Sequence, residues 1–284
     1  MGAEINLELA PYAPAEMAQR VESSGVEKAR AGAGQLLALG TLAGAFIALG
    51  AIFSMVVTAG STMGFGPTRL LAGVVFSLGL ILIVVGGGEL FTGNNLLVMA
   101  WLHRRVTAGQ VLRNWAIVYA ANFLGAGLTA WFCHLSGIAS LGNSQVGQTA
   151  LQISLTKVQL SWDEAFFRGV LCNALVCLAV WLSYSARSTT DKVLAVVFPI
   201  AAFVAAGFEH CVANMFFVPY ALLLDPSVAT PEQATRLADL TWGHFLWRNL
   251  LPVTLGNIVG GAGLVGVTYW MVYLRGKPTD RAKA

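Results

Sequence analysis

Long apolar runs dominate the chain and predict six membrane-spanning helices. Each run has about the 20 residues needed to cross the hydrocarbon core of a bilayer. Because the runs are long and do not alternate, they exclude the strands of an outer-membrane barrel. Polar stretches at 137–161 and 225–243 are predicted to be loops. The expected spans are 36–58, 70–85 with a continuation, 111–135, 166–184, 193–224 with an interruption, and 250–274.

Short polar stretches interrupt the second and fifth runs, and we interpret them as helix breaks. The first break is Gly-Glu-Leu-Phe-Thr-Gly-Asn-Asn at 88–95, and the second is Gly-Phe-Glu-His-Cys-Val-Ala-Asn at 207–214. A charge at the centre of a membrane helix costs about 3 kcal/mol, and glycines weaken a helix. We therefore predict non-helical backbone at 90–95 and 207–210, followed by half-helices that meet at a polar centre inside the bilayer.

Composition places the chain among integral membrane proteins. Only 11% of its 284 residues are charged and 56% are hydrophobic, whereas a soluble domain carries about 25% charged residues. The net charge of +3 gives no indication of nucleic-acid binding. No cysteine spacing is typical of a metal site, so we expect no metal or cofactor. Free buried thiols are expected instead at Cys133, Cys172, Cys177 and Cys211.

The distribution of positive charge predicts the orientation of the chain. Six spans place both termini on one side, and the segments assigned to that side hold 12 of the 17 Lys and Arg residues. Cytoplasmic segments carry such an excess, so both termini are expected in the cytoplasm. The residues from about Asn6 to Arg30 are amphipathic and do not resemble a cleavable signal peptide. We expect them to lie on the membrane or on a neighbouring subunit.

Matching motifs indicate an internal repeat of three spans. The pattern Arg-Asn-x7-Asn-x2-Gly begins at Arg113 and again at Arg248. Because three is odd, the second copy must insert in the opposite orientation. We expect Asn122 and Asn257 to hydrogen-bond between helices rather than to bind a substrate. The predicted parts are an N-terminal cytoplasmic amphipathic helix at 1–34, a pore domain at 35–275 with repeats at about 35–136 and 162–275, and a cytoplasmic tail at 276–284.

These motifs resemble a known family of membrane proteins. Glu-Leu-Phe-Thr-Gly-Asn at 89–94 and Gly-Phe-Glu-His-Cys-Val-Ala-Asn-Met at 207–215 are similar to the two signature stretches of the formate/nitrite transporter family. Segments 175–184, 245–257 and 268–270 resemble its formate channel branch. The resemblance covers nearly the whole chain. It implies an all-α, aquaporin-like bundle of six spans with inverted three-helix repeats and two broken helices, assembled as a homopentamer in a bacterial cytoplasmic (inner) membrane.

The resemblance also implies roles for individual residues around a central chamber. His210 would lie in the chamber beside Thr92, and Lys157 in the periplasmic vestibule. The apolar slits would be formed by Phe76 and Phe203 on the periplasmic side and by Leu80, Leu90, Phe91 and Val176 on the cytoplasmic side. A polar network near His210 would contain Glu209, Asn173 and Lys28. The remaining polar residues of the breaks would be Glu89, Asn94 and Asn214.

The predicted function is a passive or proton-coupled, pH-sensitive channel for formate and similar small monovalent anions of weak acids. Nitrite and hydrosulfide are alternative substrates within the family. A neutral-solute pore of the water/glycerol type is an alternative from another class, but such pores usually pair Asn-Pro-Ala turns and neither break contains Pro. No nucleophile–base set or nucleotide-binding loop indicates an enzyme.

The residues suggest how such a pore would work, and they leave two mechanisms open. An anion crosses an apolar slit only at high cost. Lys157 would concentrate the anion, and His210, whose unperturbed pKa is about 6.5, would either supply a proton or stabilise the anion electrostatically. The backbone N–H groups at the start of each half-helix would face the chamber. Structural roles compete with each assignment: a hydrogen-bonded histidine, glutamates that hold the breaks, a capping threonine and a solvated lysine.

Overall fold

The computed structural model describes residues 10–277, and every regular element in this part of the chain is a helix. Six helices are long and apolar enough to cross a membrane, which confirms the predicted number of spans. The first half contains α1 Pro14–Arg30, α2 Ala33–Thr58, α3 Phe65–Phe76, α4 Leu78–Gly86, η1 Gly93–Leu96, α5 Leu97–Leu102 and α6 Ala108–Leu135. The second contains η2 Ile138–Ser140, α7 Gln145–Val158, α8 Trp162–Ser183, α9 Thr189–Ala206, α10 Cys211–Leu222, η3 Pro226–Val228, α11 Pro231–Ala234, η4 Leu237–Asp239, η5 His244–Leu250, α12 Leu251–Ile258, η6 Val259–Val267 and α13 Thr268–Tyr273.

Several spans begin about one turn before their apolar runs because polar side chains cap them. Thr107, Ser161 and Ser188 each accept the backbone N–H three residues further on, at 3.2, 3.3 and 3.1 Å. Such caps satisfy N–H groups that the first turn of a helix leaves free. The helices α6, α8 and α9 therefore start outside the apolar segments from which their bounds were predicted. The predicted start of the N-terminal helix at Asn6 lies outside the described residues.

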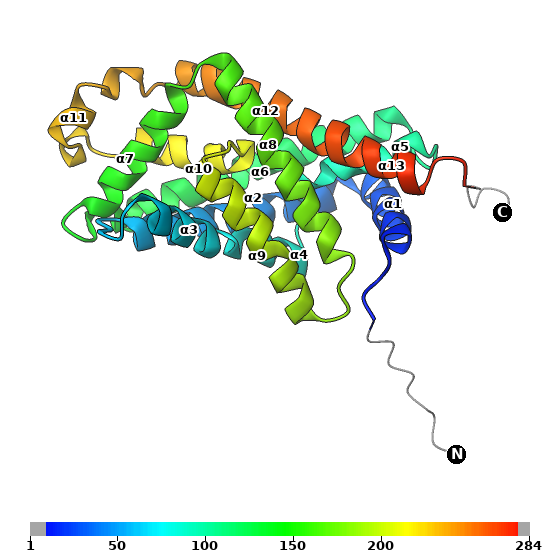
Figure 1. The fold of residues 1–284 in the computed structure, drawn as a ribbon. Helices are drawn as coiled ribbons and strands as arrows, with labels where there is room; N and C mark the ends of the chain where they lie inside the picture. The colour runs from blue at the N-terminus through cyan, green and yellow to red at the C-terminus, as the bar shows by residue number, and fades with distance from the viewer. Residues whose placement is uncertain (1–9, 278–284) are drawn as a thin grey trace.

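The segment 137–161, predicted to be a loop, contains the 14-residue helix α7, so that prediction is wrong. Five apolar residues of α7 recur at helical spacing and are buried: Val146, Ala150, Leu151, Leu155 and Val158. The polar residues between them hid this stripe from a search for long apolar runs. Figure 1 shows α7 at the end of the bundle opposite α1.

The two predicted breaks are confirmed, and each begins at a glycine in the left-handed region. The helix α4 ends at Gly86, and Gly87 has φ of 91°. The helix α9 ends at Ala206, and Gly207 has φ of 75°. An L-residue with a side chain rarely adopts these angles. The first break is followed by a half-helix made of η1 and α5, and the second break by α10. The first half-helix starts at Gly93, three residues before the predicted start at 96.

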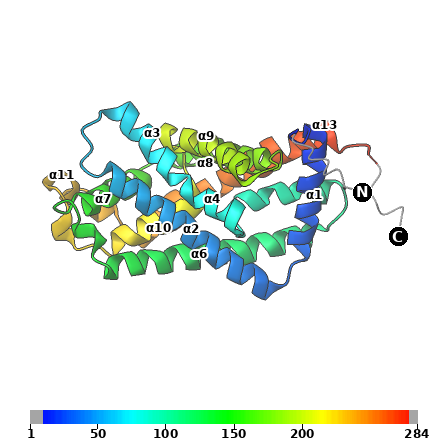
Figure 2. The ribbon, with the colours of Figure 1, turned by 90° about the horizontal axis from the view of Figure 1, so that it is seen from below.

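Glycines at equivalent positions of the two halves let the helices approach closely. A Cβ atom added to Gly125 of α6 would lie 1.9 Å from the carbonyl oxygen of Thr41 on α2. A Cβ atom added to Gly260 would lie 2.0 Å from the carbonyl oxygen of Val170 on α8. Figure 2 shows α2 beside α6 and α3 beside α9. The repeated Arg-Asn-x7-Asn-x2-Gly pattern therefore marks the same packing in both halves.

Candidate functional site: a pore between two breaks

A network of one lysine, one glutamate and three asparagines holds the first break. Asn94 donates from Nδ2 to Glu89 Oε2 at 2.6 Å and to Asn114 Oδ1 at 2.9 Å. Lys28 Nζ lies 3.0 Å from Glu89 Oε1. Asn122 donates to the carbonyl oxygen of Glu89 at 2.8 Å and accepts the backbone N–H of Phe91 at 2.9 Å. The backbone groups freed by the break are thus satisfied inside the protein.

The second break is held by the same set of side chains. Asn214 donates to Glu209 Oε2 and to Asn249 Oδ1, both at 2.7 Å. Lys157 Nζ lies 2.8 Å from Glu209 Oε1. Asn257 donates to the carbonyl oxygen of Glu209 and accepts the backbone N–H of Cys211, both at 3.0 Å. Asn122 of α6 and Asn257 of α12 also donate to backbone oxygens of α2 and α8, which confirms the prediction that they bond between helices.

The equivalence of the two networks extends each repeat by one helix. Lys28 comes from α1 and Lys157 from α7. The backbone oxygen of Lys28 accepts a hydrogen bond from Asn114, and that of Lys157 accepts one from Asn249, both at 3.0 Å. The repeats predicted at about 35–136 and 162–275 omit these two helices. The predicted network of Lys28 with Glu209 is wrong, since Lys28 pairs with Glu89 and Lys157 pairs with Glu209. Spacing within a short stretch of sequence does not show which ion pairs form between residues more than 50 positions apart.

His210 and Thr92 join the two breaks through one hydrogen bond. Thr92 Oγ1 lies 2.9 Å from His210 Nε2, and Nδ1 of the same ring accepts the backbone N–H of Ala213 at 3.1 Å. Because Nδ1 is an acceptor, the neutral ring carries its hydrogen on Nε2 and donates it to Thr92. Both side chains are almost fully buried. Asn173 lies on the other side of Thr92, donating to its carbonyl oxygen at 3.2 Å.

Two cavities enter the protein from opposite ends of the bundle. One, the α1-side cavity, has a volume of about 1290 Å³ and contains Leu80 and Leu90 in its lining. The other, the α7-side cavity, has a volume of about 520 Å³ and contains Phe76, Phe203 and His210. The cavities share no lining residue among those described, and Thr92 belongs to neither. Because Thr92 bonds His210 of the α7-side lining and directly precedes Gly93 of the α1-side lining, it lies between the two cavities.

The apolar residues predicted for the slits fall into two groups. The rings of Phe76 and Phe203 meet edge to face at 5.8 Å, and the ring of Phe203 stacks on that of His210 at 5.9 Å. Leu80 and Leu90 are buried beside the α1-side cavity. Phe91 and Val176 line neither cavity. Phe91 packs its ring against Trp115 and Tyr119, at 6.1 and 4.9 Å between ring centroids.

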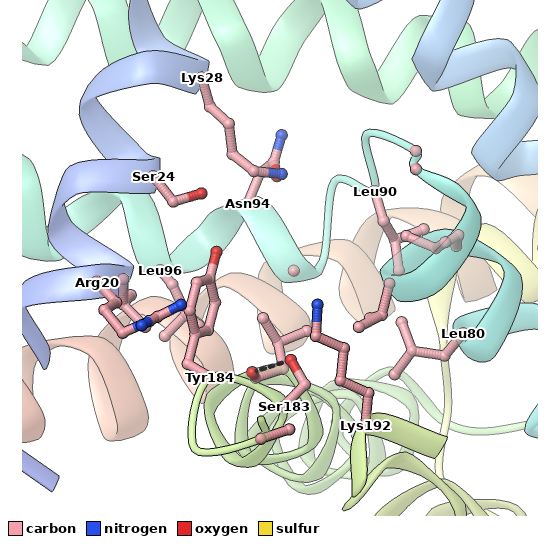
Figure 3. A pocket seen from close by; sticks show the side chains of 18 of the residues that line it. Arg20, Ser24, Lys28, Leu80, Leu90, Asn94, Leu96, Ser183, Tyr184 and Lys192 are labelled. Carbon is pink, nitrogen blue, oxygen red and sulfur yellow. Dashed lines mark hydrogen bonds between the residues drawn. The ribbon is translucent and has the colours of Figure 1, made fainter. Parts of the chain in front are cut away.

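Positive charge surrounds both cavities. The α1-side cavity has four basic and two acidic residues in its lining, which are Arg20, Lys28, Arg187, Lys192, Glu89 and Asp191. The α7-side cavity has three basic and one acidic residue, which are Arg69, Lys157, Arg168 and Glu209. Each cavity therefore has a formal charge of +2. Figure 3 shows Arg20 and Lys28 of α1 and Lys192 of α9 around the α1-side cavity.

The sequence did not predict the cavity positions of Arg20, Arg69, Arg168, Arg187 and Lys192. It also predicted free N–H groups at the starts of the half-helices, and those of α10 are not free. The number of charges in a segment indicates topology, but the position of a charge around a cavity depends on tertiary contacts. The N–H groups of Cys211 and Ala213 are bound by Asn257 and His210. The protein thus uses these donors itself, contrary to the expectation that they face the chamber.

Six spans, two facing helix breaks and two positive cavities separated by apolar side chains define a membrane channel for small anions. The family described as formate/nitrite transporter has a model that matches residues 15–271. The chain belongs to this family, as its motifs predict.

Curated relatives and solved structures agree with this assignment. The chain is 44% identical to "Formate channel FocA" of Escherichia coli (strain K12) over 270 residues, which is 92% of this chain and 94% of the relative. It is 45% identical to the protein of that name from Haemophilus influenzae over 236 residues, covering 80% and 83% of the two chains. These relatives are channels, not enzymes.

A solved "Pentameric formate channel with formate bound" has a TM-score of 0.77 and 40% identity. It covers 86% of this chain and 98% of its own. An "FNT family ion channel" has a TM-score of 0.77 at 28% identity, with coverage of 90% and 98%. The predicted aquaporin-like six-span fold is confirmed.

Proposed function

We propose that the protein is a homopentameric, pH-sensitive formate channel of the bacterial cytoplasmic membrane, with one pore in each subunit. Both termini lie in the cytoplasm, so the α1-side cavity opens inward and the α7-side cavity outward. The relatives named as formate channels and the solved pentamer with formate support this proposal. The observation that carries it is the buried Thr92–His210 pair between two positive cavities.

The cavities concentrate anions at both mouths of the pore. A cleft of one sign of charge with apolar walls raises the local concentration of the opposite ion. Lys157 contributes even though it pairs with Glu209, because the α7-side cavity keeps a net positive charge. Permeation does not require a particular direction, so the flux follows the gradient.

The apolar side chains between the cavities select for small ions that lose water cheaply. Phe76 and Phe203 close the α7 side, and Leu80 and Leu90 close the α1 side. A weakly hydrated monovalent anion, or its neutral acid, crosses such a barrier more readily than a strongly hydrated ion. No described residue accepts the hydroxyl hydrogen of Thr92, which is left to bind the passing carboxylate.

His210 acts by orienting Thr92, not by giving a proton to the anion. Protonation would put a hydrogen on Nδ1, opposite the N–H of Ala213, and break the cap of α10. The neutral ring has no proton that it gives up readily, because that would leave an imidazolate. Any proton that accompanies formate then comes from water. Of the two mechanisms open from the sequence, electrostatic stabilisation is the one we propose.

A selectivity series on reconstituted protein tests the function. Purified protein in liposomes is expected to pass formate faster than protein-free liposomes, with nitrite and hydrosulfide measured beside it. A higher flux of nitrite or hydrosulfide would assign one of these as the preferred substrate. Rapid glycerol flux without anion flux would instead support a neutral-solute pore and overturn the proposal.

A further inference from the structure

Three of the four cations of the α1-side cavity have partners inside the protein. Lys28 pairs with Glu89 and donates to Asn94 at 3.0 Å. The guanidinium carbons of Arg20 and Arg187 lie on the Tyr12 ring, 3.8 and 3.6 Å from its centroid. These three side chains therefore hold α1 in place as well as charging the cavity.

Lys192 is the fourth cation, and no residue in the range 10–277 offers it an acceptor or a ring. Its neighbour Asp191 accepts the N–H groups of Arg187 and Ser188 at 3.2 and 3.0 Å. Figure 3 shows the ammonium of Lys192 in the space between Tyr184 and Leu80. The side chain is half-buried, so only water or an anion completes its hydrogen bonds.

The position of Lys192 in α9 argues against a structural role. It lies in the first turn of the helix, where the helix dipole disfavours a cation. The matching helix of the other repeat, α3, also has a basic residue near its start, Arg69, about one turn further from its break than Lys192 is from the second break. Arg69 donates to the carbonyl oxygens of Val204 and Ala205 and so closes the end of α9. Lys192 has no such task.

We propose that Lys192 is the anion-binding residue of the cytoplasmic mouth, where its ammonium holds a small monocarboxylate beside Leu80 and Leu90. This inference rests on the proposed function and names a specificity residue for it. A charge-assisted hydrogen bond in a partly desolvated site is about twice as strong as a neutral one. The anion is then held at the apolar constriction before it loses the rest of its water.

Side-specific flux tests the role of Lys192. In liposomes with protein of known orientation, Lys192→Gln is expected to raise the half-saturating formate concentration on the cytoplasmic face about tenfold, the worth of one hydrogen bond to a charged group. The value on the periplasmic face is expected to stay within about twofold. Lys192→Arg keeps the charge and is expected to retain most of the affinity.

Arg30→Gln is the matched control, since Arg30 is exposed at the end of α1 and does not line the cavity. Equal half-saturation in Lys192→Gln and Arg30→Gln would overturn the inference while leaving the proposed function intact. A wild-type protein without formate flux would overturn both. Gel filtration and thermal unfolding in detergent are expected to be unchanged, because Lys192 makes no hydrogen bond or ion pair with another residue of the range 10–277 and glutamine can keep much of the side chain's length.

Benzoate provides a second measurement, because its ring replaces the hydrogen of formate. Added from the cytoplasmic face, it is expected to block formate flux in the wild type and to do so about tenfold less well in Lys192→Gln. Equal block of the two proteins would contradict an anion site at Lys192.

Discussion

At the scale of single residues, hydrogen-bond roles decide what the central histidine does. Ala213 presents a donor to one ring nitrogen of His210, and this fixes the neutral tautomer. Thr92 then receives the hydrogen of the other nitrogen. We therefore propose that a residue whose identity alone suggests proton transfer orients a hydroxyl group instead.

The pH profile of flux tests this assignment. Acidification that protonates His210 is expected to break the Ala213 cap and lower formate flux. His210→Asn keeps a capping side chain but does not titrate. Its formate flux is expected to be lower than that of the wild type at every pH and to show no loss from protonation of residue 210. Stopped-flow fluorescence of loaded liposomes measures both profiles. A variant with the wild-type pH profile would remove His210 from the pH response.

The Lys157–Glu209 pair makes a prediction about stability at the same scale. Both side chains are mostly buried, at 12% and 5% exposure. Removing one partner of a buried pair costs about 3–5 kcal/mol, because a charge is left without compensation. Lys157→Met is therefore expected to lower the stability in detergent more than the double variant with Glu209→Gln. Additive losses would argue that the two residues do not act as a pair.

At the scale of elements, close helix contacts and asparagine bridges replace what the breaks remove. The helices α2 and α6 meet through Gly125, and their equivalents meet through Gly260. Asn122 and Asn257 each satisfy a carbonyl oxygen and an N–H group of the backbone at a break. The interrupted helices are stable in a membrane because the surrounding helices supply these partners.

Gly125→Ala tests the packing of α2 on α6. The added methyl group would overlap the backbone of Thr41, and overpacking of this kind costs about 1–3 kcal/mol. Gly127→Ala is the control on the same helix, because nothing lies within 4 Å of its added Cβ. Thermal unfolding in detergent is expected to be lowered by the first change only. Similar midpoints for both variants would contradict the close contact.

At the scale of the whole molecule, the chain consists of two inverted units that each bring a lysine to a break. The apolar runs and the two polar interruptions were sufficient to predict the six spans and the broken helices. The helix α7 was not predicted, because a short buried stripe among polar residues differs little from a loop. The partners of Lys28 and the cavity positions of Arg69 and Lys192 depend on contacts between distant segments, which no local pattern carries.

Assembly is a prediction at this scale too. Large apolar side chains such as Phe198 and Trp247 are exposed in the single subunit, at 75% and 69%, and we expect them to face lipid or a neighbouring subunit. A pentamer would cover part of this surface. Native mass spectrometry from detergent is expected to give five copies of the 30.0 kDa chain. A stable monomer that conducts formate would show that the pore does not need its neighbours.

The most direct test of the account is formate flux through Thr92→Val and Thr92→Ser in liposomes, measured against the wild type. Valine has the shape of threonine without its hydroxyl group, whereas serine keeps that group. We predict that the valine variant loses at least about tenfold of the flux and that the serine variant keeps most of it. Unchanged flux in Thr92→Val, with the protein folded, would contradict a pathway through the Thr92–His210 pair.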